Sequence, residues 1–236
     1  LIIFFWFIFT YTGKVPPTSL PSLSAVKDTF IEMFKSGQLS NDLSLSLRRV
    51  LAGFFISSVL GISLGIFMGI SSKAKEFFQL TLTAIRQIPM IAWIPLIILW
   101  AGIGEVSKIV VILFAATFPI VVNTMGGVDS TSETYLEVAK MYGLSKKDTF
   151  FKVYLPSALP NIFTGLRLGL GASWMAVVAS ELIASSSGIG YRLNDARSLM
   201  RSDVVIVCMI IIGLVGLLMD KLIVLISHEL TPWKKN

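Results

Sequence analysis

The chain has 236 residues, of which 54% are hydrophobic and 14% are charged, and its mean hydropathy is +0.79. This composition excludes an ordinary soluble domain and predicts an all-α polytopic membrane protein in the lipid bilayer. We attribute the formal net charge of +6 to Lys and Arg beside anionic lipid headgroups, so no nucleic-acid partner is expected. A single Cys and a single His exclude a disulfide within the chain and a Cys/His metal cluster.

We expect about six transmembrane helices in one domain over residues 1–236. The first would be an incomplete span over residues 1–12, followed by a proline-rich connector and a short amphipathic helix at residues 24–35. The other predicted spans are residues 47–70, 77–100, 106–122, 161–184 and 204–226. A surface helix at residues 191–200 should precede the last of them.

Two of these spans carry signals for contacts within the membrane. Gly61, Gly65 and Gly69 recur at a four-residue spacing, which lets another helix backbone approach closely. Pro89 and Pro95 interrupt the span at 77–100, and each leaves a backbone carbonyl without its usual N–H partner. Because such carbonyls need protein or water partners in lipid, we expect this span to face the bundle interior or a cavity.

Residues 129–160 form a polar segment between two spans, and local signals predict two short helices in it. Ser130 with Glu133, and Ser145 with Asp148, have the spacing of a capping box at a helix N-terminus. The segment should therefore hang from the membrane as a compact unit.

The ends of these short helices are also predicted. Gly143 can end the first helix in a left-handed cap, because glycine adopts a positive φ at little cost. Leu155 and Pro156 are expected to close the second helix, because proline has no N–H with which to continue it. Pro160 then suits the first turn of the next span.

Apolar side chains recur at helical spacing on both short helices. They are Tyr135, Val138, Ala139 and Tyr142 on the first helix and Phe150, Val153 and Tyr154 on the second. A loop of roughly thirty residues cannot build its own core, so we expect these faces to lie in a groove of another protein. The alternatives are a solvated connector on the membrane surface and a DNA-binding helix-turn-helix. The latter is disfavoured because its second helix offers only Lys146 and Lys147 before turning aromatic, with no Arg, Asn or Gln to read bases.

The same polar segment carries a motif that resembles the EAA loop of ABC importer permeases. Its residues are Glu137, Val138, Ala139, Gly143, Leu155 and Pro156. The sequence departs from the family pattern at the middle position of the Glu-Ala-Ala triplet, where the family usually has Ala and this chain has Val. Residues 85–108 and 179–197 resemble the nitrate/sulfonate/taurine/bicarbonate branch of these permeases.

The resemblance implies the type I (MetI-like) permease fold and location in the bacterial plasma (inner) membrane. It implies partners as well: a second permease copy in a homodimer, two cytoplasmic ABC ATPase subunits and an extracytoplasmic substrate-binding protein. The loop would be the coupling helix that docks on the ATPase, with Glu137 in polar contact, Ala139 allowing close approach and Gly143 setting the turn. Lys and Arg counts do not decide the orientation, so the cytoplasmic side of the loop is implied by the resemblance alone.

No cofactor is expected in this chain, and it is not expected to be an enzyme by itself. It has no G-x-x-x-x-G-K-[ST] sequence, so ATP and Mg would be bound by the partner ATPase. The branch implies a small anion as the substrate: nitrate, an alkyl sulfonate or taurine, or bicarbonate. The alternatives are a thiamine-precursor pyrimidine or riboflavin in the same importer class and, from another class, an ATP-independent secondary transporter.

Charged residues inside the predicted spans are candidates for the transport pathway, because charges in lipid are costly. Arg86 and Arg167 would suit an anionic substrate if they line the pathway, and either could instead reach the membrane interface. Asp220 and Lys221 are expected to extend to the interface or to pair with each other.

Glu181 is expected to hold the turn that follows its own span. It lies about 21 Å from Arg167 along a continuous helix, so we expect it to pair with Arg192 or Arg197 instead. The candidate pathway or gate residues are Arg86, Pro89, Pro95, Arg167 and Glu181.

Overall fold

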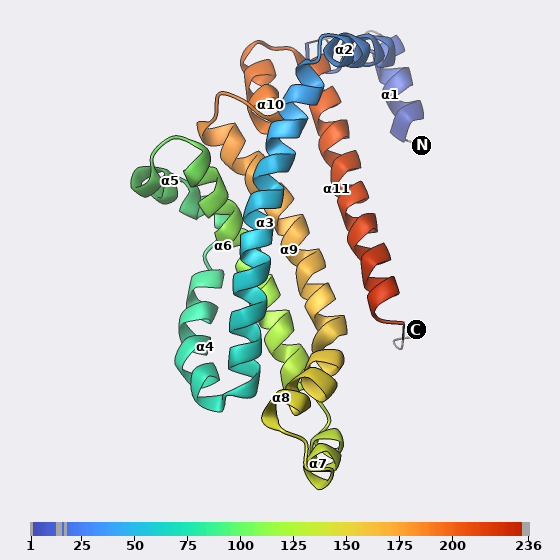
Figure 1. Cartoon of the computed structure of the whole chain (residues 1–236). Helices are drawn as coiled ribbons and strands as arrows, with labels where there is room; N and C mark the ends of the chain where they lie inside the picture. The colour runs from blue at the N-terminus through green and yellow to red at the C-terminus, as the bar shows by residue number, and fades with distance from the viewer. Residues whose placement is uncertain (1, 13–15, 17, 233–236) are drawn as a thin grey trace.

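The computed structural model describes residues 2–12, 16 and 18–232, and this part of the chain is helical throughout, with short connections. The helices lie along one elongated bundle, with α7 and α8 at one end and α2 and α10 at the other (Figure 1). We call these the α7 end and the α10 end. In chain order the elements are α1 (Ile2–Tyr11), α2 (Leu23–Lys35), α3 (Gln38–Ile70), α4 (Ser72–Arg86), α5 (Met90–Ala101), α6 (Glu105–Asp129), α7 (Glu133–Met141), α8 (Lys146–Thr149), the π-helical η1 (Phe150–Tyr154), α9 (Leu155–Ala184), α10 (Ile189–Ser198) and α11 (Ser202–Leu230).

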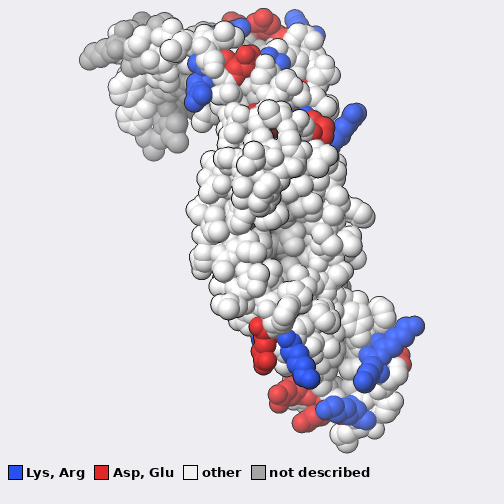
Figure 2. All heavy atoms as spheres, turned by 90° about the vertical axis from the view of Figure 1, so that its left-hand side faces the viewer, with Lys and Arg blue, Asp and Glu red and all other residues white. Residues whose placement is uncertain are grey.

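Four helices of the described chain are long and apolar enough to cross a membrane: α3, α6, the continuous helix α8–η1–α9, and α11. The bent pair α4–α5 gives a fifth crossing if the two are counted together. The expected incomplete first span is the 10-residue helix α1, which is shorter than a bilayer crossing requires and is therefore not among these four or five. Charged side chains gather toward the two ends of the molecule, with an uncharged belt between them (Figure 2).

The glycines of α3 bring its backbone against α6, as their spacing predicts. A Cβ atom added at Gly61 would lie 2.7 Å from Cγ2 of Ile120, and one added at Gly65 would lie 2.6 Å from Cβ of Thr124. On the other side of α6, a Cβ atom at Gly169 of α9 would lie 2.8 Å from Cγ1 of Ile120. α6 is therefore clamped between α3 and α9, and these three helices form the centre of the bundle.

α3 begins nine residues before the predicted start of its span at residue 47, because the arginine pair there does not end the helix. The chain stays helical back to Gln38, where Gly37 starts the helix with a φ of +75°. Arg49 consequently lies inside the bundle, whereas its neighbour Arg48 is exposed.

The expectation that Leu155 and Pro156 end a short helix is wrong. Residues 146–184 form one continuous helix, and Pro160 lies inside it rather than in its first turn. The N–H of Leu155 donates to the carbonyl of Phe150, which makes the turn before Pro156 a wide π-helical turn. Because π turns accommodate local disruption of the α-helical ladder, the chain passes both prolines without breaking.

The span predicted at 77–100 is two helices, α4 and α5, which meet at an angle of 97°. Pro89 stands at the start of α5, so the break lies at the first of the two prolines. Pro95 lies within α5 and does not interrupt it. The bend carries α5 away from the axis of α4, and α5 packs against α6 and α9.

Candidate functional site

At the α7 end, the prediction that Ser130 caps the first short helix is wrong. α7 starts at Glu133 with Ser132 as its N-cap residue, so Ser130 does not cap it. Instead the hydroxyl of Ser130 donates to the carbonyl of Gly127 (3.0 Å), because α6 continues to this point. The capping predicted at Ser145 is confirmed, since its hydroxyl oxygen accepts from the N–H of Asp148 (3.1 Å).

Gly143 ends α7 in the predicted left-handed cap, with a φ of +65°. Its N–H donates to the carbonyl of Lys140, and the N–H of Leu144 donates to the carbonyl of Ala139, both at 3.0 Å. These two bonds form a Schellman motif. A Cβ atom at Gly143 would meet nothing within 4 Å, so the backbone conformation, rather than packing within the chain, favours glycine here.

An open groove of about 810 Å³ lies between α7 and the beginning of α9, and we call it the α7 groove. Its lining comprises Tyr135, Val138, Ala139, Tyr142, Leu144, Lys152, Val153, Pro156, Ser157 and Pro160. The apolar face predicted on the first short helix is thus one surface of this groove. Tyr142 is 82% exposed, and the neighbouring Met141 is 85% exposed. Large apolar side chains with this exposure at one end of a chain mark an interaction surface.

The residues of the predicted coupling motif take different positions around this groove. Ala139 is buried at its floor, Val138 is partly exposed along it, and Pro156 lines its opposite wall. Glu137 is exposed, and its carboxylate has no hydrogen bond or ion pair within the described chain. Leu155 packs inward instead, against the buried cluster that includes Val128, Ala158 and Ile162.

The second predicted apolar face divides between two environments. Val153 lines the α7 groove, but Tyr154 packs against the same buried cluster as Leu155. Phe150 and Tyr154 also line a separate hollow with Leu136 of α7. This face is therefore covered in part by the chain itself, and the expectation that all of it needs another protein is wrong.

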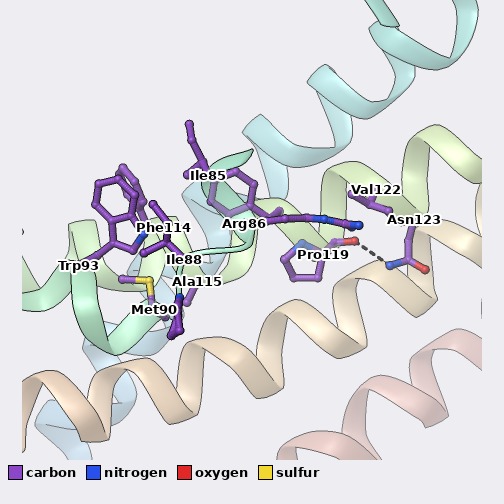
Figure 3. A pocket seen from close by; sticks show the side chains of 12 residues that line it. Ile85, Arg86, Ile88, Met90, Trp93, Phe114, Ala115, Pro119, Val122 and Asn123 are labelled. Carbon is purple, nitrogen blue, oxygen red and sulfur yellow. Dashed lines mark hydrogen bonds between the residues drawn. The ribbon is translucent and has the colours of Figure 1, made fainter. Parts of the chain in front are cut away.

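A second candidate site lies where α4 and α5 meet, facing α6, and we call it the break pocket (Figure 3). Its volume is about 400 Å³. The lining is apolar apart from one arginine and one asparagine, and comprises Ile85, Arg86, Ile88, Pro89, Met90, Trp93, Phe114, Ala115, Phe118, Pro119, Val122 and Asn123. The cavity expected beside the proline-interrupted span is therefore present.

The break pocket has a polar end and an aromatic end. Arg86 extends along the pocket toward Pro119 and Asn123, away from the rings of Trp93 and Phe114 (Figure 3). The side-chain amide of Asn123 donates to the carbonyl of Pro119 (2.8 Å). The centroids of the Trp93 and Phe114 rings are 5.4 Å apart.

Arg86 has no ion-pair partner in the part of the chain that the structure describes. It ends α4, where the partial negative charge of the last carbonyls favours a cation. Its side chain is exposed rather than buried against the other helices. An arginine with an unpaired charge beside an open pocket can bind an anion.

The other candidate pathway residues lie elsewhere. Arg167 forms a two-point ion pair with Asp220 of α11, at 2.5 and 2.7 Å, so the expectation that Asp220 extends to the interface or pairs with Lys221 is wrong. Pro95 lies further along α5, outside the lining of the break pocket. Of the five candidates, the structure brings together only Arg86 and Pro89.

Glu181 lies at the α10 end in a buried hydrogen-bonded network, which we call the Glu181 cluster. The residue is only 1% exposed, and its carboxylate accepts from Arg49 (2.6 Å), from Ser46 (2.8 Å) and from the N–H of Gly190 (3.0 Å). The expected pairing with Arg192 or Arg197 is wrong. Arg192 instead pairs with Asp42 of α3 (2.8 Å).

Arg49 is the centre of the Glu181 cluster. Besides Glu181 it binds both carboxylate oxygens of Glu105, at 2.6 and 2.7 Å, and the carbonyl of Ser187 at 3.1 Å. The turn before α10 is fitted closely around these groups, because a Cβ atom at Gly188 would lie 2.4 Å from the carboxylate of Glu181. The cluster therefore ties α3, α6, α9 and the α10 turn together.

Sequence reasoning missed Asp42, Ser46 and Arg49 as partners in this cluster. They recur on one face of α3, and that face continues through Gly53 to Gly61 and the packed glycines beyond it. The four-residue spacing of the glycines extends back through Ser57 and Gly53 to Arg49, and Ser46 and Asp42 lie three and seven residues before Arg49 on the same helical face. The predicted span begins at residue 47 and therefore leaves out the part of this face that holds Asp42 and Ser46.

Comparisons with known proteins agree with this architecture. The sequence model of the family described as "Binding-protein-dependent transport system inner membrane component" matches residues 57–231. The putative aliphatic sulfonates transport permease protein SsuC of Bacillus subtilis is 37% identical over 236 residues, covering 100% of this chain and 86% of that protein.

Two further relatives are named for related transport systems. The taurine transport system permease protein TauC of Escherichia coli is 32% identical, covering 97% of this chain and 85% of that protein. The nitrate import permease protein NrtB of Synechocystis is 38% identical, covering 79% and 68%. Among solved structures, an amino acid ABC transporter matches with a TM-score of 0.69 at 16% identity, covering 85% of this chain and 98% of that one, which supports the fold.

Proposed function

Because the chain belongs to the family of binding-protein-dependent transport system inner membrane components, we propose that it forms the pathway of an ATP-driven importer for a small anion. It is a multi-pass permease of the bacterial inner membrane, and its relatives include permeases named for sulfonates, taurine and nitrate. Its partners in this proposal are a second permease copy, two cytoplasmic ABC ATPases and an external binding protein.

In this proposal the α7 groove is the docking surface for the ATPase. Exposed apolar side chains line the groove. The carboxylate of Glu137, on the same helix, has no partner in the described chain. Docking of α7 in a groove of the ATPase would bury the exposed Tyr135, Met141 and Tyr142 and give Glu137 a polar partner. This assignment puts the α7 end in the cytoplasm.

The observation that carries the proposal is the continuous helix from Lys146 to Ala184. It begins at the α7 groove, passes through the bundle beside α6, and ends next to the Glu181 cluster at the α10 end (Figure 1). A rigid helix moves as a unit, so displacement of the α7 groove by an ATPase would also displace the α10 end of this helix. ATP binding would then bias the permease between its two access states.

The bound nucleotide and Mg belong to the ATPase in this scheme, and the chain itself supplies the lever and the pathway. Glu137 would make polar contact with the ATPase. Ala139 would allow close approach, because its side chain is small and is buried in the groove. Gly143 would turn the chain back toward the membrane with its left-handed cap.

The experiment is to replace Gly143→Asp and measure substrate-stimulated ATP hydrolysis in the complex reconstituted with its ATPase and binding protein. Aspartate tolerates the left-handed conformation better than most residues, so the variant should insert and fold. Its charge at the docking surface should abolish stimulation. Gly143→Asn is the matched control, since it keeps the shape without the charge and should retain part of the stimulation. Undiminished stimulation in Gly143→Asp would refute the coupling role.

A further inference from the structure

The break pocket joins one fixed positive charge to an apolar, aromatic wall. The guanidinium of Arg86 lies at one end with Asn123, and the rings of Trp93 and Phe114 lie at the other (Figure 3). Such a lining is complementary to a ligand with one compact anionic group and an apolar body.

The charge of Arg86 is available to a ligand. Within the described residues it has no carboxylate partner, and the carbonyls that end α4 supply only roughly half an elementary charge. Arg167 provides the contrast, because Asp220 engages it at two points. The charge of Arg167 is therefore neutralised within the chain, whereas that of Arg86 is not neutralised by any described residue.

The absence of Asp and Glu from the lining of the break pocket limits which other charged groups a ligand can carry. The lining of the break pocket contains no Asp or Glu, so a ligand ammonium group would meet no opposite charge there and would lie next to Arg86. A zwitterion is disfavoured for that reason. Nitrate or bicarbonate would use the guanidinium end and leave the aromatic end of the 400 Å³ pocket unfilled.

We propose that the break pocket is a substrate site for a short-chain alkanesulfonate, with the sulfonate at Arg86 and the alkyl chain packed against the rings of Trp93 and Phe114. The guanidinium offers two parallel N–H donors to the sulfonate oxygens, an arrangement that lysine cannot reproduce. The alkyl chain is removed from water against the two rings, which adds roughly fourfold in affinity for each buried methylene. This assignment rests on the proposed function, since it names the anion that the permease carries.

The test uses two ligands of nearly the same shape. 1-Propanesulfonate and taurine differ in that a methyl group replaces the ammonium group. The full-length permease, in nanodiscs of phosphatidylcholine so that no anionic lipid competes, is titrated with each and followed by intrinsic tryptophan fluorescence, because Trp93 lies in the pocket. We expect saturable binding of propanesulfonate that is at least tenfold tighter than that of taurine.

Variants then assign the binding to Arg86. Arg86→Gln should weaken propanesulfonate binding by about 10- to 100-fold, the loss expected for charge-assisted hydrogen bonds. The affinity of Arg86→Lys for propanesulfonate should be a few-fold lower than that of the wild type. This variant provides the test if Arg86→Gln fails to fold. The control is the double variant Arg167→Gln/Asp220→Asn, which removes a paired arginine outside the break pocket and should stay within twofold of the wild type.

Equal binding of taurine and propanesulfonate, undiminished binding in the Arg86 variants, or no saturable binding in the wild type would each overturn the assignment. Failure of this test is distinguishable from failure of the coupling role. The titration needs neither ATPase nor nucleotide, whereas the Gly143 variants report on ATP hydrolysis alone.

Discussion

The two ends of the molecule differ in which side chains they bury and which they expose. At the α10 end, charges are buried, and Arg49, Glu181 and the α10 turn satisfy one another within the chain. At the α7 end, apolar side chains such as Tyr142 and Met141 are exposed, and the chain offers little to cover them. The difference teaches that the α10 end is stabilised by its own contacts, whereas the α7 end is shaped for a contact with another protein.

The largest expected effect on stability lies in the Glu181 cluster. Glu181→Ala would leave the buried guanidinium of Arg49 with only Glu105 as a counter-ion, and breaking a buried pair in this way costs about 3–5 kcal/mol. The thermal midpoint of the purified protein in one detergent measures it. Glu229→Ala, at an exposed position near the end of α11, is the control and should change little. Equal midpoints for both variants would contradict a stabilising role for the cluster.

The next largest effect on stability is expected where α3 packs against α6. Gly65→Leu would force a side chain into the contact with Thr124 and Val121, where overpacking typically costs about 1–3 kcal/mol. Gly213→Leu on α11 is the same substitution where a Cβ atom meets nothing within 4 Å, so its thermal midpoint should stay near that of the wild type. A Gly65→Leu protein as stable as Gly213→Leu would show that α3 and α6 do not pack this closely.

A smaller effect is expected from the ion pair at the α7 end. Lys75 pairs with Asp129 across the adjoining ends of α4 and α6, and both side chains are partly exposed. Pairs in such positions contribute about 0–1 kcal/mol because water screens them. A double-mutant cycle of Lys75→Gln and Asp129→Asn, read out by thermal midpoints, should give a coupling within this range. A coupling as large as that between Arg49 and Glu181 would break the contrast between the two ends.

The smallest effect on stability should come from the α7 groove itself. Val138 is partly exposed, so Val138→Asp should leave the thermal midpoint nearly unchanged. Substrate-stimulated ATP hydrolysis should nevertheless fall on the order of tenfold, because a charge would be buried in the docking contact. The control is Val138→Ala, which restores the usual Glu-Ala-Ala sequence and should keep stimulation. A large loss of stability in Val138→Asp would mean that the groove is part of the chain's own core.

Local sequence signals predicted much of this fold. The glycine spacing on α3 predicted the close approach to α6, the left-handed cap at Gly143 is present, and Ser145 caps its helix. These predictions succeeded because each depends on neighbouring residues or on one helix face. The coupling motif was found from its residues, but its docking role stays a prediction.

The failures involve contacts between distant segments or competition between local signals. Ser130 has a capping spacing, but α6 extends to it and takes it as a C-cap residue. Pro156 is a local signal for a helix end, but a π-helical turn carries the helix past it. The charged partners of Glu181 and Arg167 could not be chosen from the sequence, because each lies on a helix more than fifty residues away.

The most direct test of the central claim is a cross-link from the α7 groove in native membranes. In a Cys208→Ser background, which removes the buried native cysteine, Tyr142→Cys carries a photoreactive group at the groove and Ser198→Cys carries the same group at the α10 end. The account predicts that mass spectrometry finds an ABC ATPase attached at residue 142 and none at residue 198. An ATPase attached at residue 198 and absent at residue 142 would contradict it.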